Sequence, residues 1–323
     1  MSAELFVAVP LLPEVRALVA SRRDAAFNLS GRTMGIAEIA GASAGARTLI
    51  VSPANRMDEA AIAALAPSVE ILGTYSVGHE HIDLAAAQAR GLRVLHTPDV
   101  LTDAVAETAM LLMLGAARRA TESIELLRSG AWAGWNPTEL VGLQVTGRRM
   151  GIYGMGRIGQ RIARRARGFD MEIHYRTRRP LAPEVEQGAI YHEAEESFFA
   201  ACDVLMLACP VTPETTGLLD AARIALLPKD AIVVNIARGA VVDDDALISA
   251  LRDRRIAGAG LDVFNNEPNL DRRYLDLPNA FLMPHIGSST MTARIDMAAS
   301  LLDSLDAIDR GDADGVREVI AGQ

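Results

Sequence analysis

Three glycines in the stretch GIYGMGRIGQRIARRA, Gly154, Gly156 and Gly159, form a G-x-G-x-x-G pattern. The pattern follows the apolar run MGIYG, which is typical of a β-strand, and it opens a segment with helical periodicity. In such a unit the first glycine makes a tight turn, the second lets the backbone approach a pyrophosphate, and the third lets helix and strand pack closely. The helix N-terminus, with Arg157 and Ile158, would attract negative charge. The motif therefore predicts a dinucleotide-binding turn.

Arginines follow the next strand-like stretch, EIHYRTRR. In an NAD-binding unit, an acidic residue at this place accepts hydrogen bonds from the ribose hydroxyls. Arg176 stands there instead. An arginine cannot accept a hydrogen bond from a ribose hydroxyl, but it can pair with a 2'-phosphate, with Thr177 and Arg178 completing the pocket. The alternative is a solvated basic turn that balances Glu184 and Glu186. The glycine spacing favours the first interpretation and predicts NADP(H) in preference to NAD(H).

The composition limits the partners of the chain. Its 323 residues are half hydrophobic and carry a formal net charge of -9, which argues against nucleic acid or an anionic membrane as the main partner. The longest apolar run, AMLLMLGAA, is too short to span a bilayer, and the N-terminus lacks a basic signal region. Cys202 and Cys209 show no C-x-x-C spacing and are interpreted as reduced, buried thiols. These features predict a cytoplasmic enzyme.

Apolar strand-like runs alternate with helical patterns along the chain, which is typical of parallel sheets covered by helices on both faces. The stretch 102–130 contains no strand signal and is predicted to join two α/β domains, and a last amphipathic helix should pack back on the first domain. The predicted strands lie at 5–12, 48–52, 69–76, 92–98, 150–154, 171–175, 203–210, 231–238, 258–264 and 280–285. The expected fold class is α/β, with two doubly wound parallel-sheet domains.

From about residue 48 onward the chain resembles the D-isomer-specific 2-hydroxyacid dehydrogenases, and most of all their glyoxylate/hydroxypyruvate reductase branch. The motifs occur in the order of the family: YSVGHEHIDLAAAQARGLRVLHTPDVLTDAVAET, the glycine motif, CPVTPETTGLL, VVNIARGAVVDDDALISAL, GAGLDVFNNEP and LMPHIGSST. The resemblance implies a Rossmann-like cofactor domain inserted into a flavodoxin-like substrate domain. The substrate domain would comprise 1–98 and 288–323 and the cofactor domain 99–287, with a dimerisation arm at 118–147 of a homodimer.

The resemblance also implies a catalytic set for NADPH-dependent reduction of glyoxylate and hydroxypyruvate to glycolate and D-glycerate. Arg238 matches the substrate-binding arginine, whose planar fork suits a carboxylate and a carbonyl. His285 matches the general acid/base, and Glu267 matches the carboxylate that orients it. Taken singly, each residue could be structural. All three follow predicted strands, where α/β sheets bind ligands.

Other roles are implied by position alone. Val77 and Gly78 resemble the loop whose backbone N–H groups bind the substrate carboxylate, although Gly78 could simply permit a turn. Trp135 is similar to a tryptophan that reaches the active site of the neighbouring subunit. Asp262 resembles the residue that accepts from the nicotinamide amide. Further positions that would line the cofactor cleft are Cys209, Pro210, Ile236, Ala237 and Gly287.

Several alternatives are open at this level. An NAD(H)-sensing corepressor-like protein shares this fold, and so do dehydrogenases of other 2-hydroxy acids. A hydrolase of thioether nucleosides would need a lysine in its site, and the only lysine, Lys229, lies in a proline turn. His79 and His81 could suggest a metal, but the loop offers no complete ligand set, so none is expected. His96 stands where the family often has asparagine.

Overall fold

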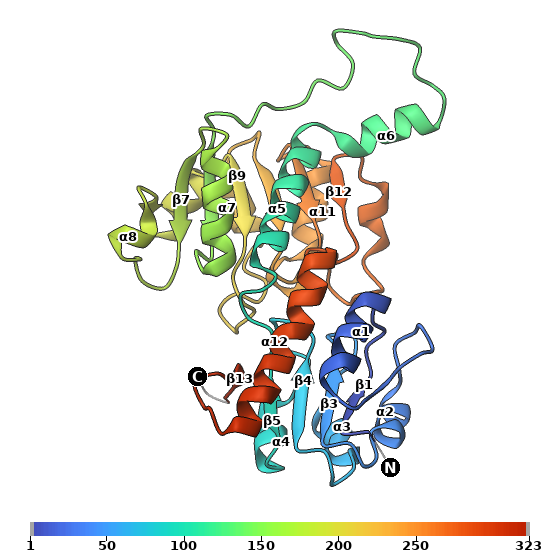
Figure 1. Cartoon of the computed structure of the whole chain (residues 1–323). Helices are drawn as coiled ribbons and strands as arrows, with labels where there is room; N and C mark the ends of the chain where they lie inside the picture. Colours follow the sequence, from blue (N-terminus) through green and yellow to red (C-terminus); the bar gives the residue numbers. More distant parts are fainter. Residues whose placement is uncertain (1–2, 321–323) are drawn as a thin grey trace. The chain divides into compact units, whose positions relative to one another are not determined.

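The computed structural model describes residues 3–320. The chain divides into two compact units, unit 1 with Met1–Leu101 and Ser288–Gln323, and unit 2 with Thr102–Gly287 (Figure 1). The sequence suggested a division after residue 98; the structure divides after Leu101, where the long helix α5 (Thr102–Ala117) begins. The predicted fold class, two α/β units with parallel sheets, is confirmed.

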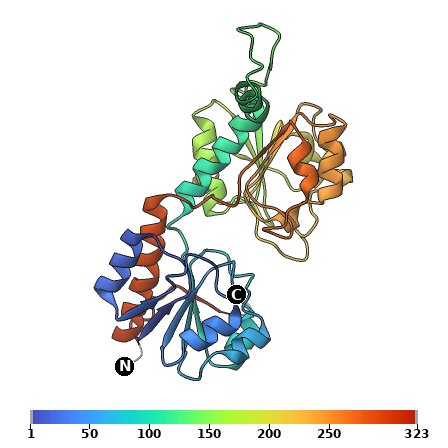
Figure 2. The same cartoon turned by 90° about the vertical axis from the view of Figure 1, so that its right-hand side faces the viewer.

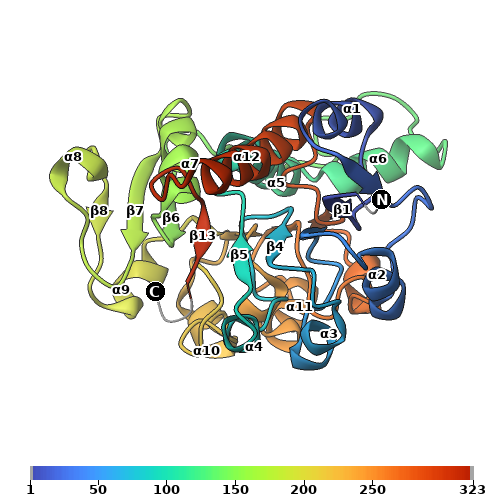
Figure 3. The same ribbon diagram turned by 60° about the horizontal axis from the view of Figure 1, so that its bottom comes forward.

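Unit 1 contains one sheet in the order β13-β5-β4-β3-β1-β2. All neighbours are parallel except β13, which pairs antiparallel with β5 at the edge of the sheet (Figure 3). The central strands β3 and β4 are buried along their whole length, because helices cover both faces. The strands are β1 (Leu5–Val7), β2 (Ala25–Phe27), β3 (Thr48–Val51), β4 (Ile71–Thr74), β5 (Arg93–Leu95) and β13 (Glu318–Val319).

Helices α1 and α12 lie side by side on one face of this sheet, and α2, α3 and α4 cover the other (Figure 2). Asp58 and Asp83 cap α3 and α4, since each carboxylate accepts a backbone N–H of the first helical turn. The bounds are α1 (Pro13–Arg22), α2 (Ile36–Ala42), α3 (Glu59–Ala64), α4 (Leu84–Ala89) and α12 (Met291–Arg310).

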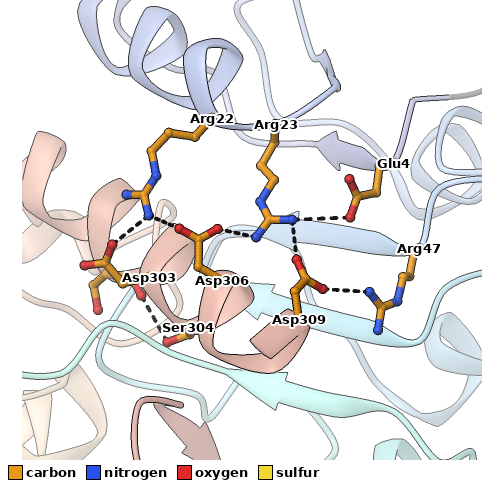
Figure 4. Close-up of polar contacts among 9 residues, drawn as sticks. Glu4, Arg22, Arg23, Arg47, Asp303, Ser304, Asp306 and Asp309 are labelled. Atoms are coloured by element: carbon orange, nitrogen blue, oxygen red, sulfur yellow. Dashed lines mark hydrogen bonds and ion pairs between the residues drawn. The ribbon is translucent and has the colours of Figure 1, made fainter. Parts of the chain in front are cut away.

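An ion-pair network fastens α12 to α1 (Figure 4). Asp306 pairs with both Arg22 and Arg23, and Asp309 pairs with Arg23 at 2.6 Å and with Arg47 at 3.1 Å. Burial works against the charge on Asp306, but the hydrogen bond from Arg22 and the two arginine charges together lower its pKa. The C-terminal helix, which is far from α1 in sequence, therefore belongs structurally to unit 1.

Unit 2 contains a wholly parallel sheet in the order β12-β11-β10-β9-β6-β7-β8. The chain starts at β6, moves outward to β7 and β8, and then returns to β9 on the other side of β6, so the strand order reverses between β6 and β9. Ligands bind at such a switch point in open α/β sheets. The strands are β6 (Arg149–Tyr153), β7 (Glu172–Arg176), β8 (Ile190–Tyr191), β9 (Val204–Leu207), β10 (Ile232–Asn235), β11 (Gly258–Leu261) and β12 (Ala280–Leu282).

The stretch that was predicted to lack strands is helical, with α5 followed by α6 (Ala120–Arg128). After α6 the chain runs outward from the sheet of unit 2 as a long loop (Figures 1 and 2), and every residue from 130 to 139 is exposed. The other helices of unit 2 are α7 (Arg157–Arg167), α8 (Pro183–Glu186), α9 (Glu195–Ala200), α10 (Ala221–Leu226), α11 (Asp244–Arg252) and the 3₁₀ turns η1 (Gly239–Val241) and η2 (Arg272–Asp276).

Candidate active site

The parallel sheet of unit 2 gathers most of the predicted site residues at one edge, because all its strands end on the same side. Gly154 follows β6, Arg176 ends β7, and Arg238 comes shortly after β10. Asp262 follows β11 directly, and His285 follows β12. The carboxyl edge of this sheet is therefore the candidate active site.

The glycine turn between β6 and α7 has the geometry expected for a dinucleotide. Gly154 has a positive φ of 102°, and a side chain there would meet the backbone nitrogen of Cys209 at 2.6 Å. A side chain on Gly159 would meet the Gly154 carbonyl oxygen at 2.4 Å. The Cβ position of Gly156 faces open space, and no side chain caps α7. The exposed backbone N–H groups at this turn fit a pyrophosphate.

Arg176 forms no ion pair with a carboxylate among residues 3–320, whereas the charge of Arg178, after the hydrogen bond with Thr212, helps to lower the pKa of Glu214. The Arg176 guanidinium donates to the His192 carbonyl at 3.1 Å, and its Nε is buried with no hydrogen-bond partner. Glu186 instead accepts from the Tyr175 hydroxyl. The Thr177 hydroxyl donates to the Arg179 carbonyl at 2.6 Å, so the Thr177 oxygen keeps only its acceptor capacity for a ligand.

His285 and Glu267 form a hydrogen-bonded pair. His285 Nδ1 lies 2.7 Å from Glu267 Oε2, while Glu267 Oε1 accepts the Phe264 N–H at 2.8 Å. Burial disfavours the charged carboxylate, but the hydrogen bonds from His285 and Phe264 and the nearby charge of Arg238 together lower the pKa of Glu267. Glu267 is therefore an anion that receives Nδ1–H, and Nε2 is the ring nitrogen that this pair leaves available.

The Asp262 carboxylate holds the segment that carries His285. Its two oxygens accept the Ile286 and Gly287 N–H groups, each at 2.8 Å, and the His285 N–H donates to the Asp262 carbonyl at 2.8 Å. Burial raises the pKa of Asp262, and these backbone donors only partly offset it. Asp262 was predicted to accept from a nicotinamide amide; in the structure its contacts position the backbone beside His285.

Arg238 lies in a tight turn between β10 and η1. The Asn235 amide donates to the Arg238 carbonyl at 2.9 Å, and the Asn235 Oδ1 accepts the Ala237 N–H at 3.0 Å. A side chain on Gly239 would lie 1.9 Å from the Phe264 carbonyl carbon, so glycine allows this turn to touch the loop that carries Glu267. Asn235 and Gly239 were not predicted; a lone polar residue ending the buried run AIVVN was the signal.

The remaining predicted positions of unit 2 differ in how deeply they are buried. Cys209 is buried, and burial raises the pKa of its thiol to about 11, so the thiol stays neutral. Ile236 and Ala237 are also buried and serve the core as well as the edge of the sheet, whereas Pro210 is exposed. Cys202 is a second free, buried cysteine, as predicted. Trp135 lies in the exposed loop after α6.

Val77 and Gly78 belong to unit 1, in the loop after β4. Neither of their N–H groups donates to another residue within 3–320. Gly78 does not have a positive φ, so no left-handed turn requires glycine there. The neighbouring histidines take different partners, since His81 contacts Thr74 at 3.0 Å and the His79 ring packs against His96. No group of three metal-ligating side chains occurs within the described part of the chain.

Comparison with known proteins agrees with this geometry. Residues 110–287 match the family model of the D-isomer specific 2-hydroxyacid dehydrogenase, NAD binding domain. Glycerate dehydrogenase of Hyphomicrobium methylovorum is 46% identical over 243 residues, covering 75% of this chain and 76% of that protein. The chain belongs to the D-isomer-specific 2-hydroxyacid dehydrogenases. The predicted family is thereby confirmed, and with it a nicotinamide cofactor for unit 2.

Other D-2-hydroxyacid dehydrogenases narrow the branch. Glyoxylate reductase of Thermococcus kodakarensis is 46% identical over 253 residues, covering 76% of this chain and 75% of the relative. The crystal structure of an NADPH-dependent glyoxylate/hydroxypyruvate reductase from Sinorhizobium meliloti superposes with a TM-score of 0.83 at 33% identity, covering 98% of this chain and 96% of that one. These relatives support reduction of 2-oxo acids.

Within residues 3–320, no helix is both long and apolar enough to cross a membrane.

Proposed function

We propose that the protein reduces glyoxylate and hydroxypyruvate to glycolate and D-glycerate, with NADPH as the preferred electron donor. The observation that carries this proposal is the His285–Glu267 pair at 2.7 Å beside the charge of Arg238, at the carboxyl edge of the sheet that carries the glycine turn. A proton donor, an anion that orients it and a cation are what the reduction of a 2-oxo acid requires of a protein. The cofactor, when bound, supplies the hydride.

Each residue then has a distinct task. The Arg238 guanidinium binds the substrate carboxylate and polarises the 2-oxo carbonyl through its planar fork. His285 donates the proton on Nε2 to the carbonyl oxygen, while Glu267 accepts Nδ1–H and holds the ring in place. Asp262 keeps the His285 backbone in place through the Ile286 and Gly287 N–H groups.

The preference for NADPH rests on Arg176. Its Nε is buried without a partner, and no carboxylate within 3–320 neutralises the guanidinium. Arg176 as a whole is only partly buried, so a 2'-phosphate at the end of β7 would supply the counter-charge to its guanidinium. Arg178, which is exposed two residues later, would add a second cation. One of the relatives is an NADPH-dependent reductase, which supports the same assignment.

The direct test follows the absorbance of NADPH at saturating cofactor with glyoxylate, hydroxypyruvate and pyruvate in turn. We expect oxidation of NADPH with glyoxylate and hydroxypyruvate, with slower turnover of pyruvate, and formation of the D isomer of glycerate by chiral chromatography. Absence of turnover with all three acids, under conditions in which NADPH binds, would contradict the proposed function and favour a cofactor-sensing protein.

We further propose that residues 118–147 form the arm of a homodimer. The loop after α6 exposes large apolar side chains, with Trp135 exposed to 85% and Trp132 to 53%. Exposed apolar surface of this kind marks a contact with another chain, and a homodimer is the commonest symmetric solution. Leu127 on α6 and Val141 beyond the loop extend the apolar surface. A second copy of this chain is the proposed occupant.

The dimer predicts a definite solution mass. Light scattering at micromolar concentration should give twice the mass of the chain, and Trp132→Ala with Trp135→Ala should shift the protein toward the monomer because two large apolar contacts are lost. If Trp135 also reaches the partner's substrate site, Trp135→Ala alone should weaken discrimination between small and bulky 2-oxo acids. A monomeric unmodified protein would rule out the arm. Leu29→Ala, an exposed apolar residue of unit 1, is the control.

A further inference from the structure

The loop that follows β4 is held by a one-way chain of hydrogen bonds. The Ser76 hydroxyl donates to the Gly78 carbonyl at 2.6 Å, and its oxygen lies 2.7 Å from Thr74 Oγ1. Because Ser76 has only one hydroxyl proton, Thr74 must donate to Ser76. Thr74 then accepts from His81 Nε2, at 3.0 Å. The Gly78 carbonyl is therefore fixed from within the loop.

The preceding carbonyl is fixed from another element. His96, which follows β5, places Nδ1 3.1 Å from the Val77 carbonyl oxygen. A carbonyl can only accept, so Nδ1 of His96 must carry a proton. The His96 backbone is itself anchored, because its N–H donates to the Arg317 carbonyl at 3.1 Å and the adjacent Thr97 N–H donates to the Ser76 carbonyl at 2.9 Å.

The consequence for the loop follows from the planarity of the peptide bond. The Val77 carbonyl and the Gly78 N–H belong to the same peptide group and point in opposite directions. Fixing the carbonyl with His96 therefore fixes the direction of the Gly78 N–H. A hydrogen bond to the carbonyl also polarises the peptide and makes its N–H a stronger donor. The Gly78 N–H, which has no acceptor within 3–320, is thus prepared for a ligand.

We infer that His96 is a positioning residue for the substrate carboxylate: its Nδ1–H aims and polarises the Val77–Gly78 peptide so that the Gly78 N–H binds one carboxylate oxygen. This inference rests on the proposed function, because it takes Val77 and Gly78 to be the carboxylate loop. His96 contacts the loop and not the substrate, so it acts through the peptide. The His79 and His96 rings make a T-shaped contact, with their centroids 6.1 Å apart, and this contact limits the rotation of the His96 ring.

The kinetic test compares three substitutions of His96 with a control substitution of the neighbouring residue Thr97. His96→Ala and His96→Leu should raise KM for glyoxylate by about threefold to tenfold, the worth of one hydrogen bond, and leave kcat nearly unchanged. The inhibition constant of oxamate, a carboxylate that is not reduced, should rise in parallel. His96→Asn should restore both values, because the Asn Nδ2–H can take the place of the imidazole Nδ1–H. NADPH affinity, measured by fluorescence titration, should not change.

Thr97→Val is the matched control, since the Thr97 hydroxyl is buried and has no hydrogen-bond partner within 3–320. It should leave KM and the oxamate constant unchanged. Suppose that the unmodified protein reduces 2-oxo acids. An unchanged KM in His96→Ala, or a His96→Asn variant as impaired as His96→Ala, would then overturn the positioning role while the proposed function stands. An unmodified protein that reduces none of them would remove both.

A spectroscopic readout needs no activity. In long-range ¹H–¹⁵N spectra of protein labelled at histidine, the signals that disappear in His96→Asn should show a protonated Nδ1. Neutral histidine in water favours the proton on Nε2, so an Nδ1–H ring would report the hydrogen bond to Val77. An unprotonated Nδ1 on His96 would overturn the inference, whatever the kinetics.

Discussion

His285→Ala should lower kcat by about 10²–10⁴ while the affinity for NADPH stays nearly intact. The reason is that in the proposed mechanism the imidazole supplies the proton to the developing alkoxide through Nε2, because Nδ1 lies 2.7 Å from Glu267 Oε2. Steady-state kinetics with glyoxylate and fluorescence titration of NADPH separate the two effects. An unchanged rate in this variant would refute the mechanism, because no other proton donor has been assigned.

Arg238 should show a different pattern. Arg238→Ala should lose most of kcat/KM, since in the proposed mechanism the guanidinium contacts both the carboxylate and the carbonyl in the transition state. Arg238→Lys keeps the charge but loses the planar fork, so it should recover only part of the loss. The exposed Arg252 at the end of α11 provides a matched control, because Arg252→Ala removes the same charge from unit 2 away from the carboxyl edge.

Glu267→Gln should change the pH dependence more than the maximum rate. The carboxylate has a lowered pKa and is therefore charged near neutral pH, where it accepts the Nδ1–H of His285. Glu267→Gln removes this charge while keeping the size of the side chain, so the pH profile of kcat should move if proton transfer from His285 depends on the carboxylate. A pH profile identical to that of the unmodified protein would contradict the coupling between Glu267 and His285.

The sheets could be predicted because parallel strands that are buried on both faces consist of continuous apolar runs in the sequence. Each of the ten predicted runs overlaps a strand, for example β10 within AIVVNIAR. Three strands were not predicted: β2, β8 and β13, which span two or three residues at sheet edges and lack fully buried sequence. β13 also pairs with a strand far away in sequence, with Glu318 opposite Leu95, and no local pattern reports that pairing.

The placement of the predicted site residues in the fold could be foreseen to a similar extent, whereas their roles stay predictions. Residues that follow strands, such as Gly154 and His285, come to one edge by the geometry of parallel sheets. The contacts that orient them were not predictable, because they join separate loops. The carboxylate of Asp262 on the Ile286 and Gly287 N–H groups is one case, and the imidazole of His96 on the Val77 carbonyl is another. The local sequence shows which residue types follow each strand, whereas the orientation of their side chains depends on contacts that only the tertiary fold creates.

The arginines after β7 should make the enzyme prefer NADPH over NADH. A charge-assisted hydrogen bond contributes about 1.5–3 kcal/mol, so one well-formed contact with the 2'-phosphate gives a preference of about tenfold to a hundredfold. Arg176 has a buried Nε with no partner, and neither Glu184 nor Glu186 forms an ion pair with it. The alternative of a basic turn balanced by those two acids therefore lacks the contacts it requires.

Arg176→Ala combined with Arg178→Ala should raise KM for NADPH strongly and leave the kinetics with NADH almost unchanged, since neither arginine gains a contact from a bare ribose. Arg176→Asp should go further, because a carboxylate repels the phosphate and accepts hydrogen bonds from the ribose hydroxyls. Arg179→Ala is the matched control: it removes the same charge from the same exposed turn, at a residue with no assigned contact to the cofactor.

Salt should reduce the preference, because Arg178 is exposed and ions screen its attraction for the phosphate. The loss should be partial, since Arg176 is less exposed than Arg178 and its charge is screened less. The measurement is kcat/KM for NADPH and for NADH in the unmodified protein and the variants, at low and high ionic strength. Equal values for the two cofactors in the unmodified protein would mean that Arg176 and Arg178 are only a solvated turn, and the ribose pocket would then need another source of specificity.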